Sequence, residues 1–342
     1  MDRLLNAKRI AVVGVAKNCG KTTTLNFLLR LAHADARVVG VMSVGIDGEA
    51  EDVLLGTPKP PVHVEVGQWV VTADEAAHAG NATLEFVASL GIETPLGDVV
   101  LCRVVEAGEV VLAGLRHRAD VHVAVNHLEG VGVDLVVIDG AYGRIAAAHT
   151  GLTDGVVVST GAVVAPHVDG IIERTGLMID RLNLPRVTET WQIDLLSRAI
   201  AQNQCLLGGP NIEPTPLHAK SALLGLPKSR DLWTSDVLAI AVPGLVSDRV
   251  IDELIHAGGT GRAVLLSDGT ALQTDARHLD RLRRHWAVYV EKSANLLGIA
   301  MNPTSVQGWT VPERALFDGL QKRWPEITIF NPIHDLESRQ QL

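Results

Sequence analysis

One ten-residue segment near the N-terminus has the composition of a phosphate-binding loop. Residues 14–23 read Gly-Val-Ala-Lys-Asn-Cys-Gly-Lys-Thr-Thr, between an apolar run at 9–15 and a stretch with helical spacing at 22–34. A loop that joins a buried strand to a helix can surround an anion with backbone amides, and the helix N-terminus adds partial positive charge. The segment therefore predicts a site for the phosphates of a nucleotide.

Individual residues of this loop are suited to binding nucleotide phosphates and Mg²⁺. Lys21 can reach the β- and γ-phosphates and act in catalysis, and the Thr22 hydroxyl can ligate Mg²⁺. Gly20 lets the backbone approach the phosphates closely, because it has no side chain. The residues that we expect to contact the nucleotide are Asn18, Cys19, Gly20, Lys21, Thr22 and Thr23.

Two aspartates are the candidates for holding Mg²⁺ and for a part in catalysis. Asp139 ends an apolar run at 133–139, and ligands of open α/β sheets bind at the carboxyl ends of strands. Asp47 follows a second apolar run at 37–44. Lys59 lies between two prolines that stiffen the backbone, so it can be aimed at a phosphate. The alternatives are a turn-forming aspartate, a solvated acidic loop and an exposed lysine, respectively.

The glycine spacing of the loop departs from the common pattern. Five residues separate Gly14 from Gly20, whereas the common pattern has four. In this respect the loop resembles those of dethiobiotin synthetase and the cobyrinic acid diamide synthases, which belong to the P-loop class that includes MinD-like ATPases. The signature lysine of MinD-type loops would fall at Ala16, one place from Lys17, so we expect no intersubunit catalytic lysine.

Beyond the loop, a further resemblance rests on several segments spread over most of the chain: 12–24, 43–49, 56–60, 135–144, 153–165 and 301–308. Together these segments resemble the ATPase-like subunit of the lysine 5,6-aminomutase reactivase. That resemblance implies an ATP-dependent protein that acts on a cobalamin- and pyridoxal-phosphate-dependent aminomutase and exchanges its damaged cofactor. It implies nucleotide contacts for Lys21 and Thr22, and more loosely roles for Asp47 and Asp139.

The sequence leaves three functions open. The leading one is an Mg-ATP-dependent ATPase that acts on a partner enzyme, an aminomutase if the resemblance holds. The second is an ATP-dependent ligase or kinase that acts on a small carboxylate, which the dethiobiotin synthetase-like loop supports. The third is a regulator that binds a nucleotide without hydrolysing it. The chain lacks the Asn-Lys-x-Asp box that selects guanine, which favours ATP over GTP.

Composition narrows the class of partner. The formal net charge is −9, from 30 basic and 39 acidic side chains, which disfavours a nucleic-acid partner. Three scattered cysteines have neither metal-like nor disulfide-like spacing and fit a reducing cytoplasm. We expect no membrane span, because the chain has no stretch of about 20 apolar residues. A homodimer is expected only by analogy with P-loop proteins that dimerise across the nucleotide.

Strand-like runs alternate with helical patterns along the chain, which is typical of an α/β fold with a mainly parallel sheet flanked by helices. The length of 342 residues favours two domains. We predict a P-loop nucleotide-binding domain at 1–185 and a second α/β domain at 186–342, with a junction region at 183–233. Two local strand pairs are also expected, 63–66 with 69–72 and 98–104 with 109–113.

Overall fold

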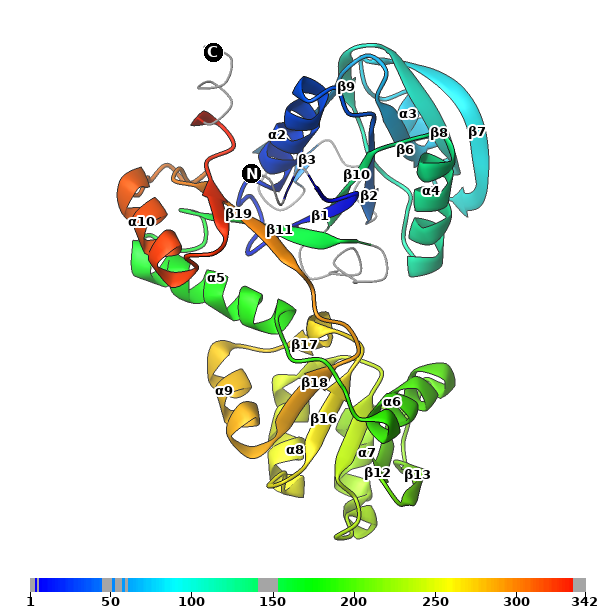
Figure 1. Cartoon of the computed structure of the whole chain (residues 1–342), viewed down its shortest axis with the longest axis vertical. Helices are drawn as coiled ribbons and strands as arrows, with labels where there is room; N and C mark the ends of the chain where they lie inside the picture. The colour runs from blue at the N-terminus through cyan, green and yellow to red at the C-terminus, as the bar shows by residue number, and fades with distance from the viewer. Residues whose placement is uncertain are drawn as a thin grey trace. The chain divides into compact units, whose positions relative to one another are not determined.

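A nine-stranded sheet is the largest element of the structure, a computed structural model that describes residues 4, 6–44, 51–52, 57–58, 61–140 and 153–334 (Figure 1). Its order is β20-β19-β11-β1-β10-β2-β6-β8-β7. From β20 to β6 the neighbours pair in parallel, whereas β8 is antiparallel to both β6 and β7. The bounds are β1 Arg9–Gly14, β2 Val39–Val44, β6 Trp69–Ala73, β7 Thr83–Thr94, β8 Gly97–Glu106, β10 Leu135–Gly140, β11 Gly155–Gly161, β19 Leu296–Asn302 and β20 Thr328–Phe330.

Helices cover both faces of this sheet, which explains why its central strands are apolar over most of their length. Helix α2 (Lys21–Ala34) packs on the face that carries Ile10 and Val12 of β1. Helix α4 (Arg118–Gly130) covers the opposite face, where Leu128 lies against Gly40 of β2. The structure also describes the short helix α3 (Asp74–Ala77), α5 (Val168–Leu182) and α10 (Glu313–Arg323).

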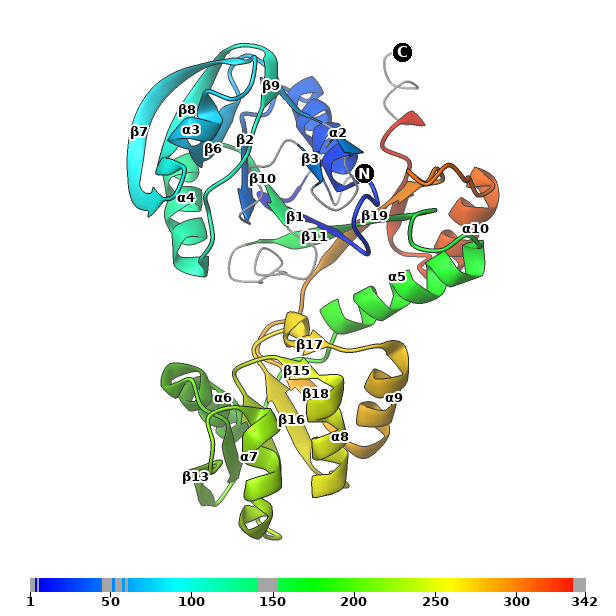
Figure 2. The same ribbon diagram turned by 180° about the vertical axis from the view of Figure 1, so that it is seen from behind.

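Helices α5 and α10 run side by side in both views of the molecule (Figures 1 and 2). Gly319 of α10 makes this close packing possible, because a Cβ atom there would lie 2.6 Å from Ile172 Cδ1 of α5. Among the helices that the structure describes, none has both the length and the apolar character needed to cross a membrane.

The chain divides into two compact units, and the second is inserted into the first. The first unit comprises Met1–Thr175 and Asn295–Leu342, and the second comprises Gly176–Ala294. The Ala294 amide donates to the Leu182 carbonyl oxygen at 2.9 Å, which ties together the two ends of the inserted segment.

This division corrects the domain boundaries expected from the sequence, 1–185 and 186–342. Strands β19 and β20 follow the inserted unit in the chain but belong to the first sheet, because β19 pairs in parallel with β11. The second unit therefore ends before β19 and does not extend to the C-terminus.

The second unit has its own α/β core around a five-stranded sheet of order β13-β12-β14-β16-β18. Trp286 is buried there, donates from its indole nitrogen to the Leu254 carbonyl oxygen at 3.0 Å, and meets Trp233 edge to face at 5.6 Å. The elements are α6 Thr190–Gln202, β12 Leu206–Gly209, β13 Ile212–Pro216, α7 Ala222–Lys228, β14 Ala239–Val242, β15 Val246–Ser247, α8 Asp248–Ala257, β16 Ala263–Leu266, β17 Leu272–Gln273, α9 Ala276–His285 and β18 Ala287–Val290, with 3-10 turns at Arg230–Leu232 and Gly269–Ala271. The region expected to be a junction, 183–233, thus contains regular elements of this unit.

Both local strand pairs expected from the sequence are wrong. Strands β5 (Val62–Val64) and β9 (Gly108–Val110) pair with each other, and β6 pairs with β2 and β8. Only Ala107 separates β8 from β9, so the chain passes from one pairing to another without a hairpin turn. A further small pair joins β3 (Glu51–Asp52) to β4 (Thr57–Pro58).

An aromatic contact links the helix after β1 to the last strand of the sheet, and we predict that the first unit depends on it. Phe27 of α2 is fully buried and stacks on Phe330 of β20 with ring centroids 4.9 Å apart. Phe27→Ala should lower the free energy of unfolding by about 3–5 kcal/mol, because it removes buried apolar surface and leaves a cavity. Urea denaturation measures the change.

Phe86→Ala is the matched control, because the Phe86 side chain is 60% exposed. Its effect should stay within about 0.5 kcal/mol. Equal destabilisation by the two substitutions would contradict the packing described for Phe27.

Candidate functional site

The segment from residue 15 to residue 20 connects β1 to α2 at the carboxyl edge of the parallel strands. β1 lies between β10 and β11, and all three strands run in the same direction. The segments that follow these strands therefore meet at one edge of the sheet, which is where ligands bind in open α/β folds. The predicted strand, loop and helix thus occur in the expected order.

Two glycines shape this loop for different reasons. A Cβ atom on Gly14 would lie 2.6 Å from Cys19 Sγ and 2.9 Å from Lys21 Cγ, so the loop folds back on its own first residue. Gly20 has φ 95° and Asn18 has φ 58°, both in the left-handed region that bends the chain sharply. The resulting curl brings the loop and the aliphatic part of Lys21 over the end of β1.

The first turn of α2 is open to an anion. Gly20 occupies the N-cap position, no side chain caps the helix, and no acidic residue lies in its first turn. Helix N-termini are usually satisfied by a side-chain oxygen or by an acidic group. An N-terminus without either presents amide donors and the positive end of the helix dipole to a bound anion.

Cys19 contributes to this loop through packing. Its side chain is 1% exposed, and burial raises the pKa of the thiol above its ordinary value. The thiol is therefore neutral near pH 7 and fills the space under the curl beside Gly14. Contact between Cys19 and a ligand would come from its backbone amide.

Asp139 lies near the carboxyl end of β10, at the same edge of the sheet as the loop, where a metal ligand would be needed. It follows the buried residues of β10 and is half-buried itself. In register, it lies opposite Val12 of β1 and Ser43 of β2. The loop begins two residues after Val12. The Asp139 carboxylate and the half-buried Thr22 hydroxyl are oxygen donors, the type that Mg²⁺ prefers.

Two other residues proposed from the sequence, Asp47 and Lys59, lie outside the described residues. The predicted loop contacts from Asn18 to Thr23 are brought together with Asp139 at one edge of the sheet. By contrast, Asp134, at the amino end of the same strand, accepts a hydrogen bond from the Val38 amide at 2.9 Å. The candidate metal ligand Asp139 and the structural carboxylate Asp134 therefore lie at opposite ends of β10.

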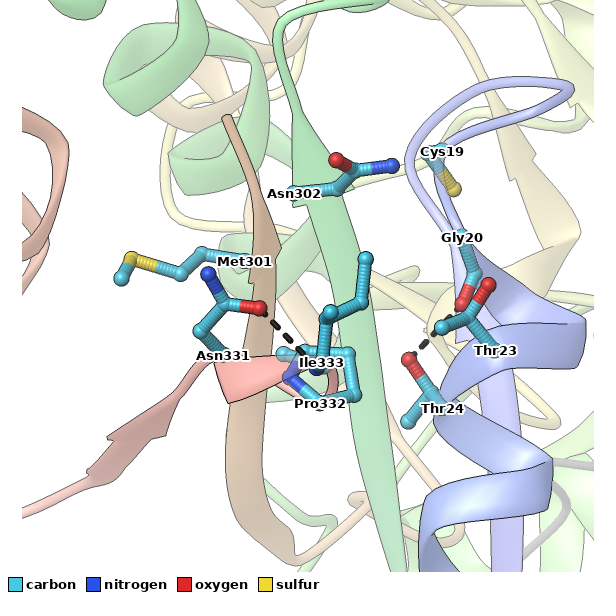
Figure 3. Close-up of a pocket in the computed structure, with 10 residues that line it drawn as sticks. Cys19, Gly20, Thr23, Thr24, Met301, Asn302, Asn331, Pro332 and Ile333 are labelled. Carbon is cyan, nitrogen blue, oxygen red and sulfur yellow. Dashed lines mark hydrogen bonds between the residues drawn. The ribbon is translucent and has the colours of Figure 1, made fainter. Parts of the chain in front are cut away.

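A pocket beside the loop adds residues that sequence reasoning did not assign to the site (Figure 3). It lies between the first turn of α2 and the segments at the ends of β19 and β20, and Figure 3 shows the Asn302 carboxamide directed toward the loop. The lining residues are Cys19, Gly20, Thr23, Thr24, Ala300, Met301, Asn302, Asn331, Pro332 and Ile333.

Hydrogen bonds hold both asparagines of this pocket. Asn302 Oδ1 accepts from the Thr304 amide at 3.0 Å, so this side chain caps the turn that follows β19. Asn331 Oδ1 accepts from the Ile333 amide at 3.0 Å, and its Nδ2 donates to Glu313 Oε1 at 2.7 Å. An Asn-Pro pair follows or ends each of these strands in the sequence, a repeated signal that could have pointed to the pocket.

Comparison of the chain with protein-family models finds no match, and a search of curated proteins finds no relative.

The burial of the three thiols leads to a prediction about their reactivity. Burial raises the pKa of Cys205 to about 11, and burial with the nearby Asp74 carboxylate raises that of Cys102 to about 11. Because the thiolate is the reactive form, iodoacetamide should modify all three cysteines slowly at pH 8 in the native chain and much faster in denaturant. Mass spectrometry of timed samples measures the rates. Labelling of native Cys19 as fast as in denaturant would contradict its burial.

Proposed function

We propose that this chain is an Mg-ATP-binding ATPase of the P-loop class that acts on a partner enzyme in the cytoplasm. The observation that carries the proposal is the curled loop between a buried parallel strand and an uncapped helix N-terminus, with Lys21 folded back over Gly14. Phosphate is the ligand chemistry that such a cradle of amides favours.

The phosphate contacts follow from this geometry. The amides of residues 18–23 would donate to the β-phosphate, and the Lys21 ammonium would neutralise charge on the β- and γ-phosphates. Thr22 and Asp139 would hold Mg²⁺, with Asp47 as a further proposed ligand. Bound Mg²⁺ supplies positive charge at the phosphate oxygens where negative charge develops during transfer. Lys21, Asp47 and Asp139 are the proposed catalytic groups.

A pocket borders the proposed phosphate loop. Thr23 and Thr24 of α2 line one side of the pocket, and its other walls include the apolar side chains of Met301, Pro332 and Ile333. The absence of a guanine-selecting box in the sequence supports ATP.

The identity of the partner rests on the resemblance to the aminomutase reactivase subunit, which extends over segments on both sides of the inserted unit. We therefore propose reactivation of a cobalamin-dependent aminomutase as the purpose of ATP turnover, and a homodimer as its working form. ATPase activity that rises on addition of such an aminomutase would support this choice.

One observation favours a second candidate. The five-residue spacing between Gly14 and Gly20 is shared with dethiobiotin synthetase, so an ATP-dependent ligase or kinase acting on a small carboxylate is the alternative. Turnover that requires a carboxylate metabolite and yields a phosphorylated or ligated product would favour it. Tight ATP binding with no hydrolysis under either condition would favour a regulator.

Removal of the loop lysine tests nucleotide binding. Lys21→Ala should weaken Mg-ATP binding on the order of 100-fold, because it removes charge-assisted hydrogen bonds to the phosphates. Isothermal titration calorimetry measures the affinity, and Lys8→Ala, at an exposed position before β1, is the control. If Lys21→Ala binds ATP as tightly as the wild type does, the phosphate-loop assignment is wrong.

A second substitution tests the metal ligand. Asp139→Asn keeps the shape of the side chain but removes its charge, so the Mg²⁺ concentration for half-maximal ATP hydrolysis should rise about 10-fold. Asp134→Asn, at the opposite end of β10, should alter stability through the Val38 contact and leave the Mg²⁺ dependence unchanged. A Mg²⁺ dependence that shifts in both variants, or in neither, would contradict the role of Asp139.

A further inference from the structure

Ser159 of β11 is linked to both ends of the loop, directly at Val15 and through Thr24 of α2 at Gly20. The register of β1 and β11 places Ser159 opposite Gly14, where the loop begins. The Val15 amide donates to the Ser159 carbonyl oxygen at 3.0 Å, so the first peptide of the loop is fixed to β11.

The far end of the loop is held through the Ser159 hydroxyl. Thr24 Oγ1 donates to the Gly20 carbonyl oxygen at 2.9 Å (dashed in Figure 3) and lies 2.9 Å from Ser159 Oγ. Because the only hydroxyl hydrogen of Thr24 is used on Gly20, Ser159 must be the donor in the second contact. Both hydroxyl side chains are buried, with 0% exposure at Ser159 and 1% at Thr24.

These contacts fix the orientation of an amide that faces the loop. The Gly20 carbonyl oxygen also accepts from the Thr24 amide at 2.9 Å, so two hydrogen bonds hold it toward the helix. In a trans peptide the N–H group points opposite to the C=O group. The Lys21 amide, which shares this peptide plane with Gly20, therefore points away from the helix body and into the loop.

We propose that Ser159 is a positioning residue for phosphate binding, which clamps the loop through Val15 at its start and through Thr24 and Gly20 at its end. This inference rests on the proposed nucleotide binding and adds a residue from a different strand to that site. Ser159 acts through the orientation of loop amides and does not itself touch the nucleotide.

The next residue of β11 provides a matched control. Thr160 points to the opposite face of the sheet, where its Oγ1 lies 2.7 Å from Thr175 Oγ1 of α5, and both residues are 0% exposed. This hydroxyl pair has the same burial and chemistry as Ser159 with Thr24 but does not contact the loop. It separates the general cost of removing a buried hydroxyl from a specific effect on the loop.

The test is titration of the full-length protein with Mg-ATP, with thermal unfolding measured in parallel. Ser159→Ala and Thr24→Val should each weaken ATP binding about 10-fold, because the loop amides lose their fixed orientation. Thr24→Ser should recover most of the affinity lost in Thr24→Val, since it keeps the hydroxyl. Thr160→Val should lower the melting temperature without changing the affinity for ATP.

The double variant gives a further readout. If both hydroxyls act through the same contact to Gly20, Ser159→Ala should add little further loss of affinity in the Thr24→Val background. Additive losses would overturn the clamp, as would wild-type ATP affinity in both single variants. A similar loss of affinity in Thr160→Val would also overturn it, because the effect would then be one of general stability.

Failure of this inference is distinguishable from failure of the proposed function. If the wild-type protein does not bind ATP, the proposed function is wrong and the clamp falls with it. If the wild type binds ATP, Lys21→Ala does not, and Ser159→Ala binds like the wild type, only the clamp is wrong. Should Ser159→Ala fold poorly, the comparison of Thr24→Val with Thr24→Ser tests the same contact.

Discussion

The parallel pairing of β1 with β10 and β11 is the constraint on which the rest of the site depends. It buries β1 between two apolar strands, and the residues from Ile10 to Val13 are at most 2% exposed. Parallel neighbours end at the same edge, so the loop after Gly14, the Asp139 carboxylate and Ser159 are all delivered to one place. A shift of one residue in this register would turn Asp139 and Ser159 to the wrong faces of the sheet.

The loop at this edge combines tight packing with open donors. Gly14 leaves room for Cys19 and for the stem of Lys21, whereas the first turn of α2 has no side-chain cap and no acidic residue. An uncapped helix N-terminus leaves amide groups that need a partner, and a phosphate meets that need with a complementary charge. The fold therefore stabilises the loop through its buried side and leaves its donors to a ligand.

Local sequence patterns are sufficient to predict elements whose residues lie close together in the chain. The apolar run at 9–15, the loop glycines and the helical spacing at 22–34 predict a strand, a loop and a helix in that order, and β1, the loop and α2 confirm it. The pairing of strands that lie far apart in the sequence is harder to predict from such patterns. Strand β7 is largely exposed and lacks a regular apolar alternation, so its antiparallel pairing with β8 had no local signal.

The same limitation explains the domain boundary and the pocket. The apolar residues of β19 predict a buried strand, but periodicity does not identify the sheet that a strand joins. Because β19 and β20 return to the first sheet beyond the inserted unit, Asn302 and Asn331 reach the loop from more than 280 positions away in sequence. Each asparagine alone suggests a turn, and only the fold brings the two to one pocket.

The central claim is that the loop between β1 and α2 binds the phosphates of a nucleotide. A crystal structure of the full-length protein grown with Mg²⁺ and a non-hydrolysable ATP analogue tests it most directly. The account predicts electron density for the phosphates within hydrogen-bond distance of the amides of residues 18–23 and of the Lys21 ammonium, with Mg²⁺ beside Thr22 and Asp139. A nucleotide bound elsewhere on the chain, with the loop vacant, would contradict it.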